Sequence, residues 1–226
     1  MRECFGVSRK IFMMQGVKKI TDGLIGSFVT VTVICIAIAA TVMFRPLYYF
    51  DIDYLDIPER SGYTKEQCIE NYDVLIDYNL IGGPEVLEFP DMQMSEHGRI
   101  HFEEVKAIFV PAQWISCAGI LLFILLMCRY KSYSWLRASV LTAVTVCVAV
   151  LAAVLIDWEW AFETMHAIFF RNDYWIFNSK TDPIIKILPD TFFMHCGIMI
   201  VAIVLIINVA FEIIYRKKRK NGRTDI

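Results

Sequence analysis

Four long apolar stretches, separated by polar segments of unequal length, dominate the pattern of this sequence. They contain no Asp, Glu, Lys or Arg and are Leu24–Phe44, Ala107–Cys128, Ala138–Ile156 and Phe193–Phe211. A helix of roughly 20 apolar residues crosses a hydrocarbon core of about 30 Å. The pattern therefore predicts four transmembrane helices, the last of which we extend to residue 214.

The first apolar stretch has the basic residues of a secretion signal before it. The apolar core of such signals runs about 7–15 residues. Leu24–Phe44 is longer and continues beyond the small triplet Ala37-Ile38-Ala39. We therefore interpret it as an uncleaved membrane anchor.

Charge is distributed unevenly between the segments that flank these stretches. The N-terminal segment, the short loop between the second and third stretches and the C-terminal tail hold 14 basic and 4 acidic residues. The two longer loops hold 8 basic and 20 acidic residues. Because Lys and Arg are enriched in cytoplasmic loops, both termini are predicted to be cytoplasmic, and the longer loops are predicted to form an extracellular cap.

The predicted fold is thus a membrane protein of four transmembrane α-helices with an extracellular cap formed by the two outer loops. The segments are a cytoplasmic N-terminus (1–23), spans at 24–44, 107–128, 138–156 and 193–214, cap segments at 45–106 and 157–192, a cytoplasmic loop (129–137) and a basic tail (215–226).

The basic run Arg216–Lys220 resembles a nucleic-acid-binding tail in composition. Its place directly after a span instead favours attraction to anionic membrane lipids, so membrane lipids and no nucleic acid are the expected partners. Of the seven cysteines, only Cys68 lies clearly in the predicted cap. It has no partner there for a disulfide.

The first outer segment contains one well-marked helix. Thr64–Gln67 reads as a capping box, and apolar residues then recur at helical spacing as far as Leu80. We expect Gly82-Gly83-Pro84 to end this helix and Glu85–Phe89 to form a short strand. After Gly98, a helical pattern runs from Ile100 into the second span.

The second outer segment is rich in aromatic residues. The helical pattern of the third span continues into it, and one face then carries Phe162, Met165, His166 and Phe169. Further on, Asp182 followed by Pro183 fits the start of a short helix, Ile184–Leu188. Two interpretations remain open: the aromatic residues anchor the protein at the membrane interface, or they line a pocket.

All four histidines lie outside the spans or at their outer boundary: His97, His101, His166 and His195. Histidine is the side chain best suited to proton transfer near neutral pH. His101 and His166 both lie on apolar helix faces close to the predicted interface. These positions fit either two structural histidines or a pair that acts in catalysis.

A metal site is the weaker alternative for this region. His97 and His101 are four residues apart and would share one face of a helix. Gly98 weakens that helix, and the only further ligands in reach are Glu103 and Glu104. We therefore predict no metal and no cofactor.

Two motifs resemble those of the lipoprotein intramolecular transacylase family, Lit. One is the run 165–175, Met-His-Ala-Ile-Phe-Phe-Arg-Asn-Asp-Tyr-Trp, followed by similar residues at 181–185 and 188–193. The other is His101-Phe102-Glu103-Glu104-Val105-Lys106, where the family motif has Met at Phe102 and Asp at Glu104. Asn71-Tyr72 is also similar. The number of spans and the loop sizes match along the whole chain.

The resemblance implies roles for particular residues in an acyltransferase of the bacterial plasma membrane. His101 and His166 would be the catalytic pair. The substrate-binding residues would be Tyr72, Phe162, Phe169, Phe170 and Trp175. The supporting residues would be Glu104, Asn71, Asp173 and Asp182.

The implied substrate is a diacylated lipoprotein whose N-terminal cysteine has a free amino group. The enzyme would move the sn-2 acyl chain from glycerol to that amine, with two histidines as acid and base. The residues alone support less, namely an interfacial site with two histidines. An interfacial lipid hydrolase and a non-catalytic membrane scaffold remain alternatives.

Overall fold

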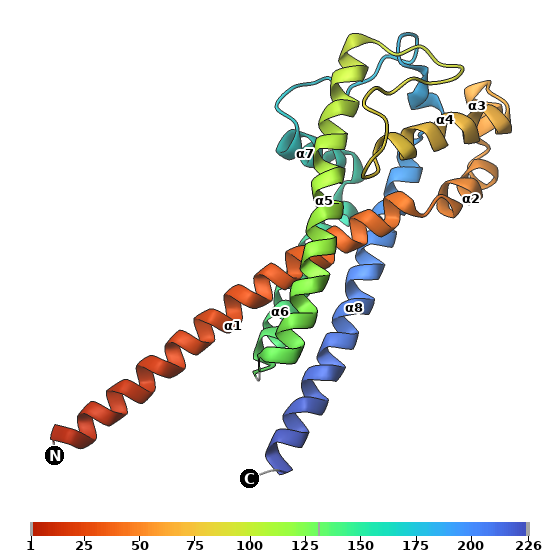
Figure 1. Cartoon of the computed structure of the whole chain (residues 1–226). Helices are drawn as coiled ribbons and strands as arrows, with labels where there is room; N and C mark the ends of the chain where they lie inside the picture. Colours follow the sequence, from red (N-terminus) through yellow and green to blue (C-terminus); the bar gives the residue numbers. More distant parts are fainter. Residues whose placement is uncertain (1, 131, 225–226) are drawn as a thin grey trace.

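The computed structural model describes residues 2–130 and 132–224, with side chains described over 13–130 and 132–221. These residues form α-helices, one short 3-10 helix and irregular loops, and no strand (Figure 1). The long helices are α1 (Arg2–Met43), α5 (Glu96–Arg129), α6 (Ser134–Ile156) and α8 (Asp190–Thr224). Each is long and apolar enough to cross a membrane. The predicted four spans are therefore confirmed as four long apolar helices.

The four long helices pack mainly through α1, which contacts α5, α6 and α8. Their shared core contains Val29, Val33 and Ala37 of α1, together with Trp135 and Leu136 of α6. The outward side chains are also apolar; Leu155, for example, is 83% exposed. A long helix that is apolar on every side is typical of a protein surrounded by lipid.

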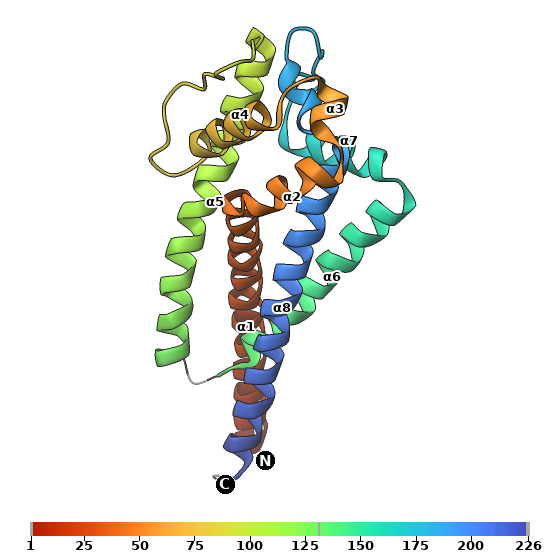
Figure 2. The same cartoon turned by 90° about the vertical axis from the view of Figure 1, so that its right-hand side faces the viewer.

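The two longer loops fold together at one end of the long helices, opposite both chain termini (Figures 1 and 2). We call this region, residues 46–95 and 157–189, the cap. Its helices are α2 (Pro46–Tyr54), α3 (Ile57–Ser61), α4 (Lys65–Tyr78), α7 (Trp158–Phe169) and the 3-10 helix η1 (Pro183–Lys186). Their core includes Tyr48, Ile52, Tyr72, Ile184 and Ile187, all at most 3% exposed.

Helix α4 begins as predicted but ends earlier. The Thr64 hydroxyl accepts a hydrogen bond from the Gln67 amide, and the Gln67 side chain accepts one from the Thr64 amide, so the capping box is confirmed. The helix ends at Tyr78, before Gly82. The side-chain amides of Asn79 and Gln113 donate to the carbonyls of Leu75 and Asn79. These side-chain donors replace the backbone amides that would bond the two carbonyls if the helix continued.

The predicted strand over Glu85–Phe89 is wrong. This segment is irregular, with Leu87 buried in the cap core and the Phe89 ring packed edge-on against Phe102. Its apolar residues pack individually against the cap, while Val86 is exposed. It has no neighbouring strand in the described part of the chain to pair with.

The continuous helix expected after the third span is interrupted at Asp157. This residue has extended backbone angles, and its carboxylate accepts a hydrogen bond from the Trp160 amide at 3.0 Å. Aspartate side chains often compete with the helical backbone in this way. The interruption separates α6 from α7 and lets α7 turn back toward the other cap helices, as Figure 2 shows.

The short helix predicted at Ile184–Leu188 is instead the 3-10 helix η1, which begins at Pro183. The Asp182 side chain does not cap it. Its carboxylate accepts hydrogen bonds from the Ser95 amide and the Thr181 hydroxyl, each at 2.7 Å. Asp182 thus joins the second cap segment to the beginning of α5.

Two further polar contacts attach cap helices to the long helices. Arg45, between α1 and α2, forms ion pairs with Asp73 (2.9 Å) and Asp77 of α4. Asp51 of α2 is completely buried and accepts a hydrogen bond from Nδ1 of His195 in α8 at 2.9 Å. Both contacts join residues far apart in the sequence, and they hold α4 and α2 in place.

Gly98 does not weaken α5, because the helix starts before it. The Ser95 hydroxyl accepts a hydrogen bond from the Gly98 amide, and the helix begins at Glu96. A Cβ atom at Gly98 would lie 2.2 Å from Oδ1 of Asp182. Glycine is therefore required for the close approach of the 178–182 loop.

We expect Gly98→Ala to destabilise the protein by about 1–3 kcal/mol, the usual cost of overpacking. Thermal unfolding in detergent micelles would measure the change. The matched control is Gly197→Ala in α8, where an added Cβ has open space. This control should be neutral or slightly stabilising, since alanine is the better helix former. Equal melting temperatures for the two variants would contradict the prediction.

Candidate active site

The histidines at positions 101 and 166 come together where α5 meets the cap. His101 lies in α5, six residues before the apolar stretch that starts at Ala107, and His166 lies in the last turn of α7. Their ring centroids are 6.2 Å apart. The two residues are only 6% and 9% exposed. The fold thus places two buried imidazoles close enough to act on one bound molecule.

Aromatic rings surround this pair. Phe170 meets the His101 ring edge-on at 4.7 Å and also lies 5.6 Å from His166. Trp175 stacks on His166 with ring centroids 4.5 Å apart, and Phe162 lies 4.2 Å away on the same helix. Phe177 contacts His101 at 5.4 Å. An enclosure of this kind contains little water and lowers the local dielectric.

The position of one proton follows from the contacts of His166. Its Nδ1 lies 2.8 Å from the carbonyl oxygen of Phe162. A carbonyl can only accept a hydrogen bond, so Nδ1 carries the hydrogen. In the neutral ring, Nε2 then holds the free lone pair.

Burial keeps both rings neutral at physiological pH. It lowers the pKa of His101 to about 4, with a smaller contribution from the neighbouring His166. Burial also lowers the pKa of His166, although the hydrogen bond to the Phe162 carbonyl acts in the opposite direction. Charging either imidazole in this enclosure is unfavourable because the ring loses its hydration. His166 is the more basic of the two, since its cationic form is supported by that hydrogen bond.

A carboxylate lies one turn after His101 on α5. Oε1 of Glu104 accepts a hydrogen bond from the Asn172 side-chain amide at 2.8 Å. The side-chain oxygen of Asn172 accepts one from the Tyr174 amide at 3.0 Å. Asn172 therefore holds the Glu104 side chain in position from the loop after α7. Asn172 lies within the 165–175 motif, but its contact with Glu104 becomes apparent only in the folded loop.

The other residues implied by the resemblance lie elsewhere in the cap. Tyr72 stacks on Tyr48 at 3.8 Å, and Asn71 donates to the Gln67 carbonyl. Phe169 and Asp173 have exposed side chains. Neither these four residues nor Asp182 forms a ring contact or hydrogen bond with the histidine pair among the described contacts. Phe177 does contact His101, although the sequence marked it only as one of many interfacial aromatics.

No group of three potential metal ligands occurs among the described His, Cys, Asp and Glu residues. His97 instead stacks on Tyr174, with ring centroids 4.2 Å apart. At the histidine pair, two neutral imidazoles within an aromatic enclosure offer proton transfer and hydrogen bonding.

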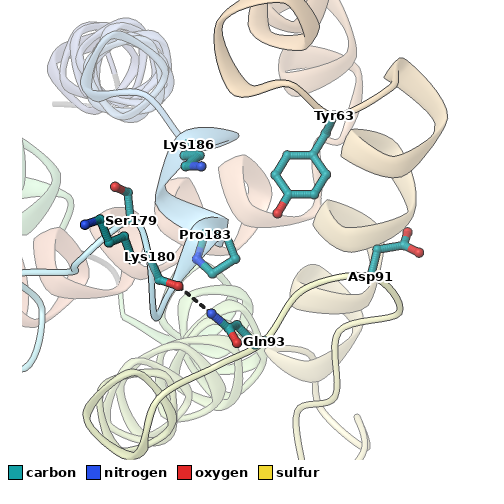
Figure 3. A pocket seen from close by; sticks show the side chains of 7 residues that line it. All are labelled: Tyr63, Asp91, Gln93, Ser179, Lys180, Pro183 and Lys186. Atoms are coloured by element: carbon teal, nitrogen blue, oxygen red, sulfur yellow. Dashed lines mark hydrogen bonds between the residues drawn. The ribbon is translucent and has the colours of Figure 1, made fainter.

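A separate polar cavity of about 500 Å³ lies elsewhere in the cap (Figure 3). Its lining side chains are Tyr63, Asp91, Gln93, Ser179, Lys180, Pro183 and Lys186. The Gln93 side chain crosses it to donate to the Lys180 carbonyl. None of these residues has a ring contact or hydrogen bond with His101 or His166 among the described contacts. The cavity is therefore distinct from the aromatic enclosure.

The four long apolar helices define an integral membrane protein, with a pair of buried histidines at one end of these helices. The sequence model of the family described as lipoprotein intramolecular transacylase Lit matches residues 24–193. The chain belongs to this family, and it is accordingly an acyltransferase. The resemblance seen in the two sequence motifs is thereby confirmed.

Solved structures agree with this assignment. The membrane-integral lipoprotein intramolecular transacylase Lit from Bacillus cereus is 32% identical, with a TM-score of 0.85 over 92% of this chain and 99% of that chain. A variant of that protein with one histidine replaced by arginine has a TM-score of 0.81, also at 32% identity, over 97% of this chain and 100% of that chain. No curated protein matches the chain significantly.

Proposed function

We propose that the protein moves the sn-2 acyl chain of a diacylglyceryl-cysteine lipoprotein to the α-amino group of that cysteine, giving the lyso form. His166 and His101 would act as the base and its partner. The observation that carries the proposal is the pair of neutral, buried imidazoles, 6.2 Å apart within an aromatic enclosure. Membership of a lipoprotein transacylase family supports the substrate class.

The reaction exchanges an ester for an amide within one molecule. The unprotonated amine attacks the sn-2 carbonyl carbon, and a carbon–nitrogen bond forms. As the tetrahedral intermediate collapses, the bond between the acyl carbon and the glycerol oxygen breaks. The nitrogen loses one proton and the glycerol oxygen gains one, so the reaction is balanced without any further reactant.

His166 suits the first proton transfer. Its Nδ1–H is held by the Phe162 carbonyl, which leaves the Nε2 lone pair free to take the proton from the attacking amine. His101 has the lower pKa and remains neutral, so its ring can donate a hydrogen bond to the oxyanion that forms at the carbonyl. Groups positioned for general acid–base catalysis contribute about 10²–10⁴-fold in rate.

The enclosure would contribute by orientation and by excluding water. Holding the ester beside the amine can supply about 7–11 kcal/mol of the barrier reduction. Phe170 packs against the His101 ring and Trp175 against the His166 ring. Water would compete with the amine for the ester, and its exclusion favours transfer over hydrolysis.

We propose further that the cap faces the outside of a bacterial plasma membrane. The helix ends opposite the cap carry the excess of basic residues, which marks the cytoplasmic side. The charged residues at the cap end are mainly acidic. This orientation gives the site access to lipoproteins in the outer leaflet.

We expect acyl transfer to depend on pH in two steps. As pH falls through about 7.7–8.0, the substrate amine becomes protonated, and kcat/KM should fall about tenfold per pH unit. The His166 pKa lies below its usual value, so its neutral form persists to lower pH and is then lost as well. Below this point the slope should approach a hundredfold per unit. Initial rates between pH 5 and 9 with a diacyl lipopeptide would measure both limbs. Undiminished transfer at pH 5 would contradict this scheme.

The proposed function is tested by mass spectrometry of a reporter lipoprotein. The host is a bacterium that normally keeps the diacyl form, with and without this protein. An unchanged total mass, with one acyl chain moved to the amino group in tandem spectra, is the expected result. Loss of one acyl mass would indicate hydrolysis instead. No change in the lipopeptide, with the protein present in the membrane, would favour the non-catalytic scaffold.

A further inference from the structure

Two buried polar atoms, one in the histidine pair and one a helical turn after it, have no hydrogen-bond partner in the described part of the chain. They are Nδ1 of His101 and Oε2 of Glu104. Buried polar atoms nearly always have partners. The two residues are three positions apart on α5, which places their Cβ atoms about 5–6 Å apart on one helix face. Two such atoms on one helix face indicate a place where a bound molecule supplies the missing hydrogen bonds.

The Glu104 carboxylate is held in place, but no basic side chain among the described contacts pairs with it. Its Oε1 is bound by Asn172, which leaves Oε2 without a donor. The nearest basic residues of the same helix are engaged elsewhere. Arg99 pairs with Glu96 and Glu103. Lys106 lies over the Tyr78 ring and donates to the Pro84 carbonyl. The oxygen is therefore suited to a cation supplied by a ligand.

We infer that Glu104 binds the α-amino group of the lipoprotein substrate and thereby selects substrates with a free amino terminus. The inference rests on the proposed function. A diacylglyceryl-cysteine has a cationic nitrogen at this position, and its N–H groups match a carboxylate oxygen that lacks donors. Hydrogen bonds between charged partners are shorter and stronger than neutral ones.

The same contact suits the reaction itself. When the amine attacks the ester carbon, positive charge develops on the nitrogen. The neighbouring carboxylate stabilises that charge until the proton passes to Nε2 of His166. A lipoprotein whose amine is already acylated carries no charge there and would leave Oε2 unpaired.

A pair of non-reactive ligands tests this role. Both are diacylglyceryl-cysteine lipopeptides with an ether in place of the sn-2 ester, so no chain can move. One has the α-amino group, and the other has a hydrogen atom in its place. Dissociation constants are measured with the full-length protein in lipid nanodiscs. Wild type should bind the amine form about 10- to 100-fold more tightly, as expected for a hydrogen bond to a charged group.

Glu104→Gln should abolish most of this preference, bringing the ratio close to one. The matched control is Glu103→Gln, at an exposed neighbour on the same helix that pairs with Arg99. This control should keep the wild-type ratio. If Glu104→Gln weakens both ligands equally and preserves the ratio, the residue only supports the fold of the site and the inference is wrong. Thermal unfolding of each variant shows whether it is folded.

The ester substrate separates this inference from the proposed function. If wild type transfers the acyl chain but Glu104→Gln keeps the preference for the amine ligand, the inference about Glu104 is wrong and the proposed function stands. Absence of transfer by folded wild type overturns the proposed function, whatever the ligands show. Transfer together with a lost preference in Glu104→Gln supports both.

Discussion

Replacing His166 with alanine is expected to lower acyl transfer by about 10²–10⁴-fold, the usual contribution of a general base. The substitution removes the His166 ring, whose tautomer is set by the hydrogen bond of its Nδ1 to the Phe162 carbonyl. His101→Ala should have a loss of similar size, because the oxyanion would lose a donor. Single-turnover assays with a diacyl lipopeptide would measure both.

The combined variant provides a stricter test. Residues that act as a unit are not additive, so His101→Ala with His166→Ala should lose little more than the worse single variant. His97→Ala is the matched control, since it removes an exposed histidine from the same helix as His101. It should keep most of the activity. Near-normal transfer in both single variants would contradict the catalytic role of the two histidines.

Replacing His195 with alanine is expected to destabilise the fold by about 3–5 kcal/mol, the cost of removing one partner from a buried pair. Asp51 has no exposed surface, and the His195 ring is its side-chain hydrogen-bond partner. Without that ring, a buried carboxyl group would remain unpaired at the junction of α2 and α8. Thermal unfolding in detergent micelles would measure the loss.

A second variant distinguishes this cause from simple loss of packing. Asp51→Ala combined with His195→Ala removes both polar partners, so the double variant should be more stable than His195→Ala alone. If the double variant is less stable than either single variant, the buried carboxyl group is not the source of the loss.

Much of the fold was predictable because the bilayer imposes a simple requirement on sequence. A stretch without charges, as in Ala138–Ile156, has few structures open to it besides a helix across the membrane. The start of α4 was also predictable, since Thr64 and Gln67 form a local pattern that requires no distant contact. In contrast, the break at Asp157 depended on one side chain competing with an otherwise helical run.

The candidate site was only partly predictable. The position of His101 and His166 on apolar faces indicated burial, and motif resemblance indicated their pairing. The contact itself depends on how α7 turns back, which no local pattern specifies. The orientation of Glu104 by Asn172 and the ion pairs of Arg45 likewise join residues far apart in the chain. Such contacts become apparent only when the loops are folded.

Helix α5 runs without interruption from the cap into the membrane. His101 is six residues from Ala107, which corresponds to about 9 Å of helical rise. The elevation of the imidazole above the hydrocarbon boundary is therefore set by the backbone of a single helix. An apolar helix adjusts its tilt to the thickness of the surrounding bilayer. We therefore expect lipid composition to influence how far a substrate must rise from its leaflet to reach the histidines, and membrane thickness to influence the rate of the proposed transfer.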